Sequence, residues 1–124
     1  MVELETFEIS SRVLTVDGSA LPRAGVTWLE AVALANDRSA KDGLEAAYRI
    51  AGAQVEWNPR STGWRLPTEA EWVSAASAGA ATPTGDRLRE FAWTALDRVD
   101  GPQPVATKRA NALGLFDALG NVWE

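Results

Sequence analysis

Hydrophobic and polar positions alternate along the first part of the chain. Residues 4–16 hold two short runs, LETFEI and RVLTV, in which apolar side chains recur roughly every second position. That period is typical of strands with one buried face. The pattern therefore predicts two short, half-buried strands before residue 17.

A helical period follows. Thr27 and Glu30 have the spacing of a capping box, in which the hydroxyl and the carboxylate bind free backbone N–H groups of the first turn. Apolar residues then recur at helical spacing, and Gly43 is a typical stop. The pattern predicts a helix from about Trp28 to Lys41.

A second capping box predicts a second helix. Thr68 and Glu71 repeat the spacing, directly after Pro67, whose ring keeps the preceding residue extended. The helix is expected to end at Gly79. Trp72 lies four residues after the cap and is expected to face inward.

The remaining stretches carry weaker patterns. They predict a hairpin, an extended piece and one helical turn, at residues 47–57, 104–107 and 115–119 respectively. Residues 86–100 fit strand and helix equally. Short strands, two main helices and long loops indicate an α+β fold, and 124 residues suit a single domain.

The net charge of the chain argues against some classes of function. The chain has 17 acidic and 12 basic residues, a net charge of −5, which argues against nucleic-acid binding and against a polybasic membrane patch. No apolar stretch is long enough to span a membrane, and the N-terminal residues lack the pattern of a leader. We therefore expect a cytoplasmic protein.

The chain contains no cysteine and no histidine. These are the thiolate and imidazole donors on which copper, iron and zinc sites depend, so the chain alone is not expected to bind copper or iron. Calcium, which takes oxygen ligands, is compatible with the composition. The six tryptophans bury large areas, and most are expected in the core.

One group of residues near the end of the chain could converge on a cation. Two carboxylates and two backbone carbonyls would supply four oxygen ligands for calcium, from Asp117, Gly120, Val122 and Glu124. The alternative is a helix end followed by an extended piece with solvated acids. Spacing alone favours that alternative.

Three stretches taken together resemble a known family. GVTWLEA (25–31), WRLPTEAEW (64–72) and NALGLFDALGNVWE (111–124) are similar in sequence and order to signatures of the formylglycine-generating-enzyme, or sulfatase-modifying-factor, family. The resemblance covers about residues 20–124 and implies a C-type-lectin-like variant of an α+β fold.

The family resemblance bears on function in two ways. Its members include an oxidase that converts a sulfatase cysteine to formylglycine with copper, an iron-dependent sulfoxide synthase, and non-catalytic binding proteins. In the oxidase, calcium is held at positions that match the four residues above, so the resemblance implies calcium there. The oxidase's copper-binding cysteines lie in a part of the family domain that follows the stretch ending at Glu124.

Three functions follow, and no catalytic residue is assigned. The first is a non-catalytic binding or interaction module, a pseudoenzyme whose partner is an unidentified protein or small ligand. The alternative is the N-terminal part of a formylglycine-generating oxidase, or of a related enzyme, that needs a missing C-terminal half. The third is a structural remnant that assembles with a second copy or with a complementing second chain.

Overall fold

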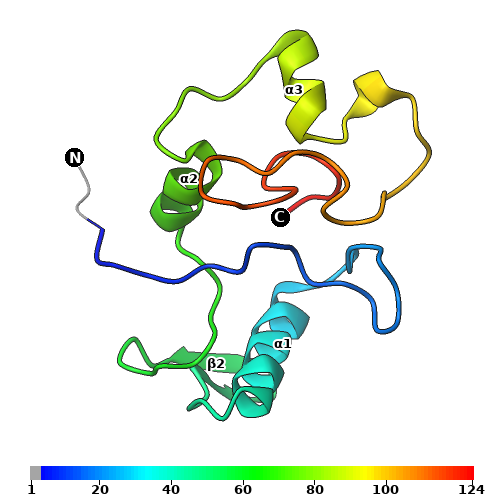
Figure 1. Ribbon diagram of the computed structural model, residues 1–124. Coiled ribbons are helices and arrows are strands. Elements are labelled where there is room, and N and C mark those ends of the chain that lie inside the picture. The colour runs from blue at the N-terminus through cyan, green and yellow to red at the C-terminus, as the bar shows by residue number, and fades with distance from the viewer. Residues whose placement is uncertain (1–3) are drawn as a thin grey trace. The chain divides into compact units, whose positions relative to one another are not determined.

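The computed structural model describes residues 4–124; residues 1–3, at the start of the stretch considered above for a leader, lie outside it. The chain divides into two compact units, each described by itself. The central unit is Gly25–Pro67, and the split unit combines Met1–Ala24 with Thr68–Glu124. Figure 1 shows their helices and long connecting loops.

The central unit begins with helix α1, Trp28–Lys41. The Thr27 hydroxyl accepts a hydrogen bond from the Glu30 N–H at 3.2 Å, and the Glu30 carboxylate accepts one from the Thr27 N–H at 2.7 Å. These two bonds satisfy donors that the first turn would otherwise leave free. The predicted helix and its cap are confirmed.

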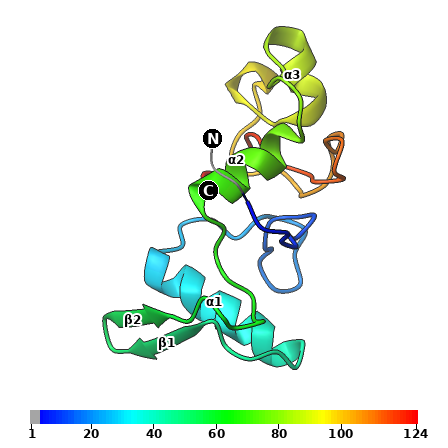
Figure 2. The ribbon, with the colours of Figure 1, turned by 90° about the vertical axis from the view of Figure 1, so that its left-hand side faces the viewer.

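A two-stranded hairpin lies beside α1, as Figure 2 shows. Strands β1 (Tyr48–Ala51) and β2 (Gln54–Trp57) pair antiparallel, which confirms the predicted hairpin. The Asn36 side chain on α1 binds both backbone groups of Tyr48: its amide donates to the carbonyl at 2.7 Å, and its oxygen accepts from the N–H at 3.1 Å. One polar side chain thus fixes the strand on the helix.

Small side chains form the core of the central unit. Ser39 donates to the Ala35 carbonyl at 2.9 Å and accepts from the Trp64 N–H at 2.7 Å. This buried hydroxyl therefore has a donor and an acceptor, which offsets the cost of its burial. The buried residues here are Val32, Ala35, Ser39 and Ala47.

The split unit contains the other two helices. Helix α2 (Glu69–Ser77) starts at the predicted capping box of Thr68 and Glu71 and ends at a left-handed residue. Helix α3 (Gly85–Phe91) and a 3₁₀ turn (Ala95–Asp97) follow. The second predicted helix is confirmed, and the ambiguous stretch after residue 85 begins as a helix.

The predicted strands at residues 4–16 do not form. Among the described residues this segment has only an isolated bridge, between Thr15 and Pro22. Phe7 and Ile9 are half-buried and Glu8 is exposed, so the alternation is present without a ladder. A strand needs a second strand with which it forms a ladder of hydrogen bonds. This segment instead makes isolated hydrogen bonds to loops, such as the one from the Phe116 N–H to the Ser11 carbonyl at 2.9 Å.

Two later expectations are also wrong. Residues 104–107 contain a turn, with Ala106 at φ 58°, and residues 116–119 form bends, with Asp117 at φ 55°. A positive φ interrupts both an extended strand and a right-handed helix. In each case side-chain hydrogen bonds, described below, accompany the unusual backbone.

Most of the tryptophans were expected in the core, and none of the six, all within the described residues, is fully buried. Trp28 and Trp57 are about half exposed, and Trp123 is 101% exposed. The split unit instead buries Ala75, Ala92 and Leu115.

Within residues 4–124, no helix has both the length and the apolar character needed to cross a membrane. The cytoplasmic location stays a prediction.

Candidate functional site

The loop from Asp117 to Glu124 lies in the split unit and holds all four residues of the predicted cation site. Asp117 is 3% exposed and left-handed. Its carboxylate accepts hydrogen bonds from the Ala106 N–H at 2.7 Å and from the Asn121 side-chain amide at 3.3 Å. These bonds stabilise the buried charge.

The middle of the loop is fixed on the backbone at Trp93. The Asn121 N–H donates to the Trp93 carbonyl at 2.8 Å. A side chain at Gly120 would collide with that same carbonyl, and Gly120 has φ 73°. Glycine is therefore required for two reasons, the close approach and the left-handed backbone.

Asn121 adds a second attachment. Its side-chain oxygen accepts from the Gln103 N–H at 2.9 Å, and its amide donates to the Gln103 carbonyl at 3.0 Å. Non-glycine residues with positive φ are uncommon, yet Asp117 and Asn121 both have it here. Such conformations persist only where surrounding contacts determine them, and they gather at binding sites.

Glu124 faces helix α2. The Trp72 indole N–H donates to the Glu124 carboxylate at 2.6 Å. Loss of solvent around the carboxyl group raises the pKa of Glu124, the Trp72 hydrogen bond opposes this, and the negative charge of Asp117 raises the pKa further. The two acids thus lie close enough to repel each other.

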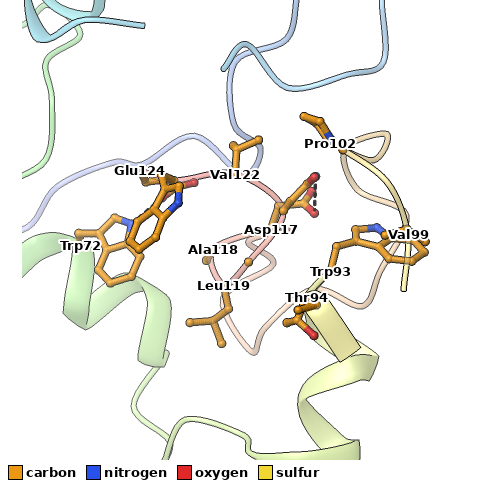
Figure 3. A pocket seen from close by; sticks show the side chains of 15 residues that line it. Trp72, Trp93, Thr94, Val99, Pro102, Asp117, Ala118, Leu119, Val122 and Glu124 are labelled. Carbon is orange, nitrogen blue, oxygen red and sulfur yellow. Dashed lines mark hydrogen bonds between the residues drawn. The ribbon is translucent and has the colours of Figure 1, made fainter. Parts of the chain in front are cut away.

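A cavity of about 830 Å³ opens over this loop. In Figure 3, Glu124 and Trp72 stand at one side, Trp93 and Val99 at the other, and Asp117 lies between them. Most of the wall is apolar, and among residues 4–124 its charged side chains are the two acids, with no lysine or arginine. The lining residues are Trp72, Trp93, Thr94, Ala95, Val99, Gly101, Pro102 and residues 117–124.

The structure brings Asp117, Gly120, Val122 and Glu124 to one cavity. It places no third acid with the two carboxylates: residues 4–124 contain no group of three aspartate, glutamate, histidine or cysteine residues arranged to hold a metal. The oxygen donors suit a hard cation such as calcium. Calcium binding itself stays a prediction.

An ion-pair cluster lies behind one wall of the cavity. The Lys108 ammonium is 4.1 Å from the centre of the Trp93 ring and donates to Asp97 at 2.9 Å. The Lys108 hydrogen bond, followed by the Thr94 N–H, lowers the pKa of Asp97 to about 2. Lys108 thus contacts the Trp93 ring while it pairs with Asp97.

Sequence reasoning missed three residues of the site. Trp72 was expected to face inward, which its half-buried position fits, but its bond to Glu124 spans 52 positions and no local pattern reports it. The role of Trp93 is equally non-local. Asn121 could have been recognised, because asparagine is one of the few residues besides glycine that adopt the left-handed conformation.

Known proteins share this architecture. The family model described as "Sulfatase-modifying factor enzyme 1-like domain" matches residues 6–124. The solved structure titled Treponema denticola variable protein 1 is similar over 86% of this chain and 50% of its own, with a TM-score of 0.76 and 29% identity. This likeness confirms the α+β fold of the formylglycine-generating-enzyme type.

Two relatives show how much of the domain is present. Chaperone protein LppX of Paenibacillus barcinonensis is 29% identical over 86% of this chain and 51% of its own length. Formylglycine-generating enzyme of Mycobacterium tuberculosis is 36% identical over 71% of this chain and 33% of its own length. The chain thus spans about half of the first and a third of the second. The matched region, which includes the loop and the cavity, shows that the chain belongs to the sulfatase-modifying-factor enzyme 1-like family.

Proposed function

We propose that this chain is a non-catalytic binding module and that the cavity between Trp72 and Trp93 is its binding site. One observation carries the proposal: an open, largely apolar cavity of about 830 Å³ is built on a loop held by side-chain hydrogen bonds. Small-molecule sites generally have this size, apolar walls and a few placed polar groups. LppX is named a chaperone protein, which is in keeping with a binding role.

The composition supports the same proposal. The chain has no cysteine or histidine, so it contributes none of the thiolate or imidazole donors that bind copper or iron. Any redox chemistry in which it took part would need donors from other residues. Binding needs only the cavity.

A ligand screen tests this function. A fragment library is screened by ligand-observed NMR against the wild-type chain and against Ala118→Phe, which places a ring in the cavity. Ala46→Phe, at an exposed position in the central unit, is the matched control. We expect fragments that bind the wild type and the control but not Ala118→Phe. Binding that Ala118→Phe leaves intact would contradict the proposal.

The likeness to a formylglycine-generating enzyme favours a second candidate, the N-terminal part of an oxidase. This candidate predicts that a Cys-x-Pro-x-Arg peptide is converted only when copper and a C-terminal half from a relative are supplied together. Conversion is read by mass spectrometry of the peptide. An inactive reconstituted assembly that is folded by circular dichroism would argue against it.

Calcium is a separate proposal for the same loop. The carboxylates of Asp117 and Glu124 and the carbonyls of Gly120 and Val122 would be its ligands, and their mutual arrangement around one cavity supports it. Bound calcium stabilises the folded state by mass action. We therefore expect the melting temperature to rise with calcium and to return with a chelator, whereas an unchanged value at millimolar calcium would contradict the proposal.

A further inference from the structure

A second cavity, of about 320 Å³, lies in the split unit beside the end of helix α2 and beside helix α3. Two arginines line it: Arg87, on α3, and Arg109, in the segment before the turn at Asn111. This basic cavity differs from the cavity over the loop, whose charged lining residues are acids. Two positive charges from separate elements therefore face one hollow.

Arg109 is held in the wall of the basic cavity by three contacts. Its backbone N–H donates to the Glu90 carbonyl at 2.9 Å, its guanidinium lies 5.5 Å from the centre of the Phe91 ring, and one guanidinium N–H donates to the Glu90 carboxylate at 3.4 Å. A guanidinium has five N–H donors. The other N–H groups of Arg109 therefore remain for a ligand.

Arg87 is exposed, and among residues 4–124 it has no hydrogen-bond or ion-pair partner. The planar fork of a guanidinium matches the two oxygens of a carboxylate, and such pairs form charge-assisted hydrogen bonds. A carboxylate in the basic cavity would thus give Arg87 the partner that its own chain does not supply.

The acid that lines the basic cavity does not cancel these charges. Asp117 is buried, and both of its oxygens are engaged by the protein: one accepts from the Ala106 N–H at 2.7 Å and the other from the Asn121 amide at 3.3 Å. Hydrogen bonds from the protein partly neutralise a buried carboxylate. The two guanidinium groups therefore determine the charge that a ligand meets.

The end of helix α2 could also repel an anion, because free carbonyl groups give a helix C-terminus a partial negative charge. Here those carbonyls have donors. The Asn111 amide donates to the Ala75 carbonyl at 2.8 Å and to the Ala76 carbonyl at 3.4 Å, and the Ala80 N–H donates to the Ser77 carbonyl at 2.9 Å. The repulsion from this end of α2 is correspondingly reduced.

We propose that the basic cavity binds a small organic carboxylate: the carboxylate pairs with Arg87 and Arg109, and its apolar body lies against Phe91, Pro83 and Leu115, which line the same space. The volume suits such a ligand, since it lies at the lower end of the range for small-molecule sites. An apolar body would also be removed from water against these side chains. This site is additional to the cavity between Trp72 and Trp93 and does not depend on it.

Three probes that share one ring test the charge preference. They are 3-phenylpropionate, its neutral amide 3-phenylpropanamide, and 3-phenylpropylamine, each titrated at pH 7 without added calcium into the isotope-labelled chain and followed by NMR. We expect the carboxylate to bind about tenfold more tightly than the amide and the amine to bind weakest, with shifts at Arg87, Arg109 and Ala112. Equal binding of carboxylate and amide, stronger binding of the amine, or no binding of the carboxylate at millimolar concentration would each overturn the inference.

Variants locate the preference. Arg87→Gln removes a side chain without a partner in the chain, so the fold is retained and carboxylate affinity should fall about fivefold; Arg109→Gln should have a similar effect. Arg49→Gln is the matched control, because Arg49 is an exposed arginine of the central unit with a comparable ion pair, 3.8 Å from Glu56. It should leave binding unchanged.

Ala112→Phe fills the basic cavity from an exposed position that does not line the cavity over the loop. It should abolish carboxylate binding while circular dichroism shows an unchanged fold. A preference that survives both arginine variants, or shifts confined to the Trp72 and Trp93 indole signals, would place the carboxylate elsewhere and overturn the inference.

Discussion

The two units are stabilised in different ways. In the central unit a helix and a hairpin provide regular backbone hydrogen bonds. Asn36 joins the helix to the hairpin, and Ser39 joins it to the segment at Trp64. In the split unit the helices are short, and long loops are held by individual polar side chains. Periodic sequence patterns predict helices and hairpins, and they do not predict loops that individual side chains hold.

Asn111 illustrates the second kind. Its amide donates to the Ala75 carbonyl in α2 at 2.8 Å, and its oxygen accepts from the backbone N–H groups of Leu113 and Leu115 at 3.0 and 3.1 Å. A single side chain thus closes a turn and ties it to a helix. The stability of such a unit depends on a few specific side chains, whereas that of the central unit depends on many backbone hydrogen bonds.

The largest expected effects come from two glycines, one in each unit. A methyl group at Gly63 would collide with the Glu45 carbonyl, and one at Gly120 with the Trp93 carbonyl. Because backbone cannot move away as a flexible side chain can, Gly63→Ala and Gly120→Ala should each lower the free energy of unfolding by about 3 kcal/mol or more. Urea denaturation followed by circular dichroism measures the loss.

Gly52→Ala is the matched control for this pair. Gly52 has φ 61° and open space around it, so alanine there meets only left-handed strain of about 1–2 kcal/mol. Hydrogen exchange then tells the units apart: Gly63→Ala should release α1 amides first, and Gly120→Ala the loop amides. Equal losses for Gly63→Ala and Gly52→Ala would show that the close approach is not essential.

The next effect tests the polar support of the split unit. Asp117→Ala leaves the Ala106 N–H without its acceptor and leaves the Asn121 amide with only the Gln103 carbonyl. An unsatisfied buried donor costs about 1–3 kcal/mol, so we expect a loss in that range. Asp117→Asn keeps one acceptor and tolerates positive φ, and should cost about half as much. Equal stability of all three proteins, by urea denaturation, would mean that the loop does not need this carboxylate.

The same contrast explains what the sequence could and could not predict. The helices at Trp28–Lys41 and Glu69–Ser77 were predictable because a capping box and a helical period are local signals. The residues of the cavity loop were predictable as a group from the family resemblance. Their geometry was not, because Asp117 bonds to Ala106 and Glu124 to Trp72 across long sequence separations.

The next effect tests an ion pair of the split unit with acid. The pKa of Asp97 is lowered from 3.8 to about 2, first by the Lys108 hydrogen bond and then by the Thr94 N–H. Since the folded value lies below the unfolded one, the stabilisation is fully present above about pH 4 and is lost as the pH falls toward about 2. Urea midpoints of wild type and Asp97→Asn should therefore differ at pH 6 and converge near pH 2. A constant difference across this range would exclude Asp97 as the source.

The smallest effect compares the same device in both units. Thr27 and Thr68 are caps with equivalent bonds to Glu30 and Glu71. Loss of a capping threonine generally costs about 1 kcal/mol, so Thr27→Ala and Thr68→Ala should give similar, small decreases in urea stability. Serine at each position keeps the hydroxyl and should therefore retain most of the stability that alanine loses. If Thr68→Ala cost several times more than Thr27→Ala, the cap of α2 would have to support the cavity wall at Trp72 as well as its own helix, since that indole lies on the first turns of α2.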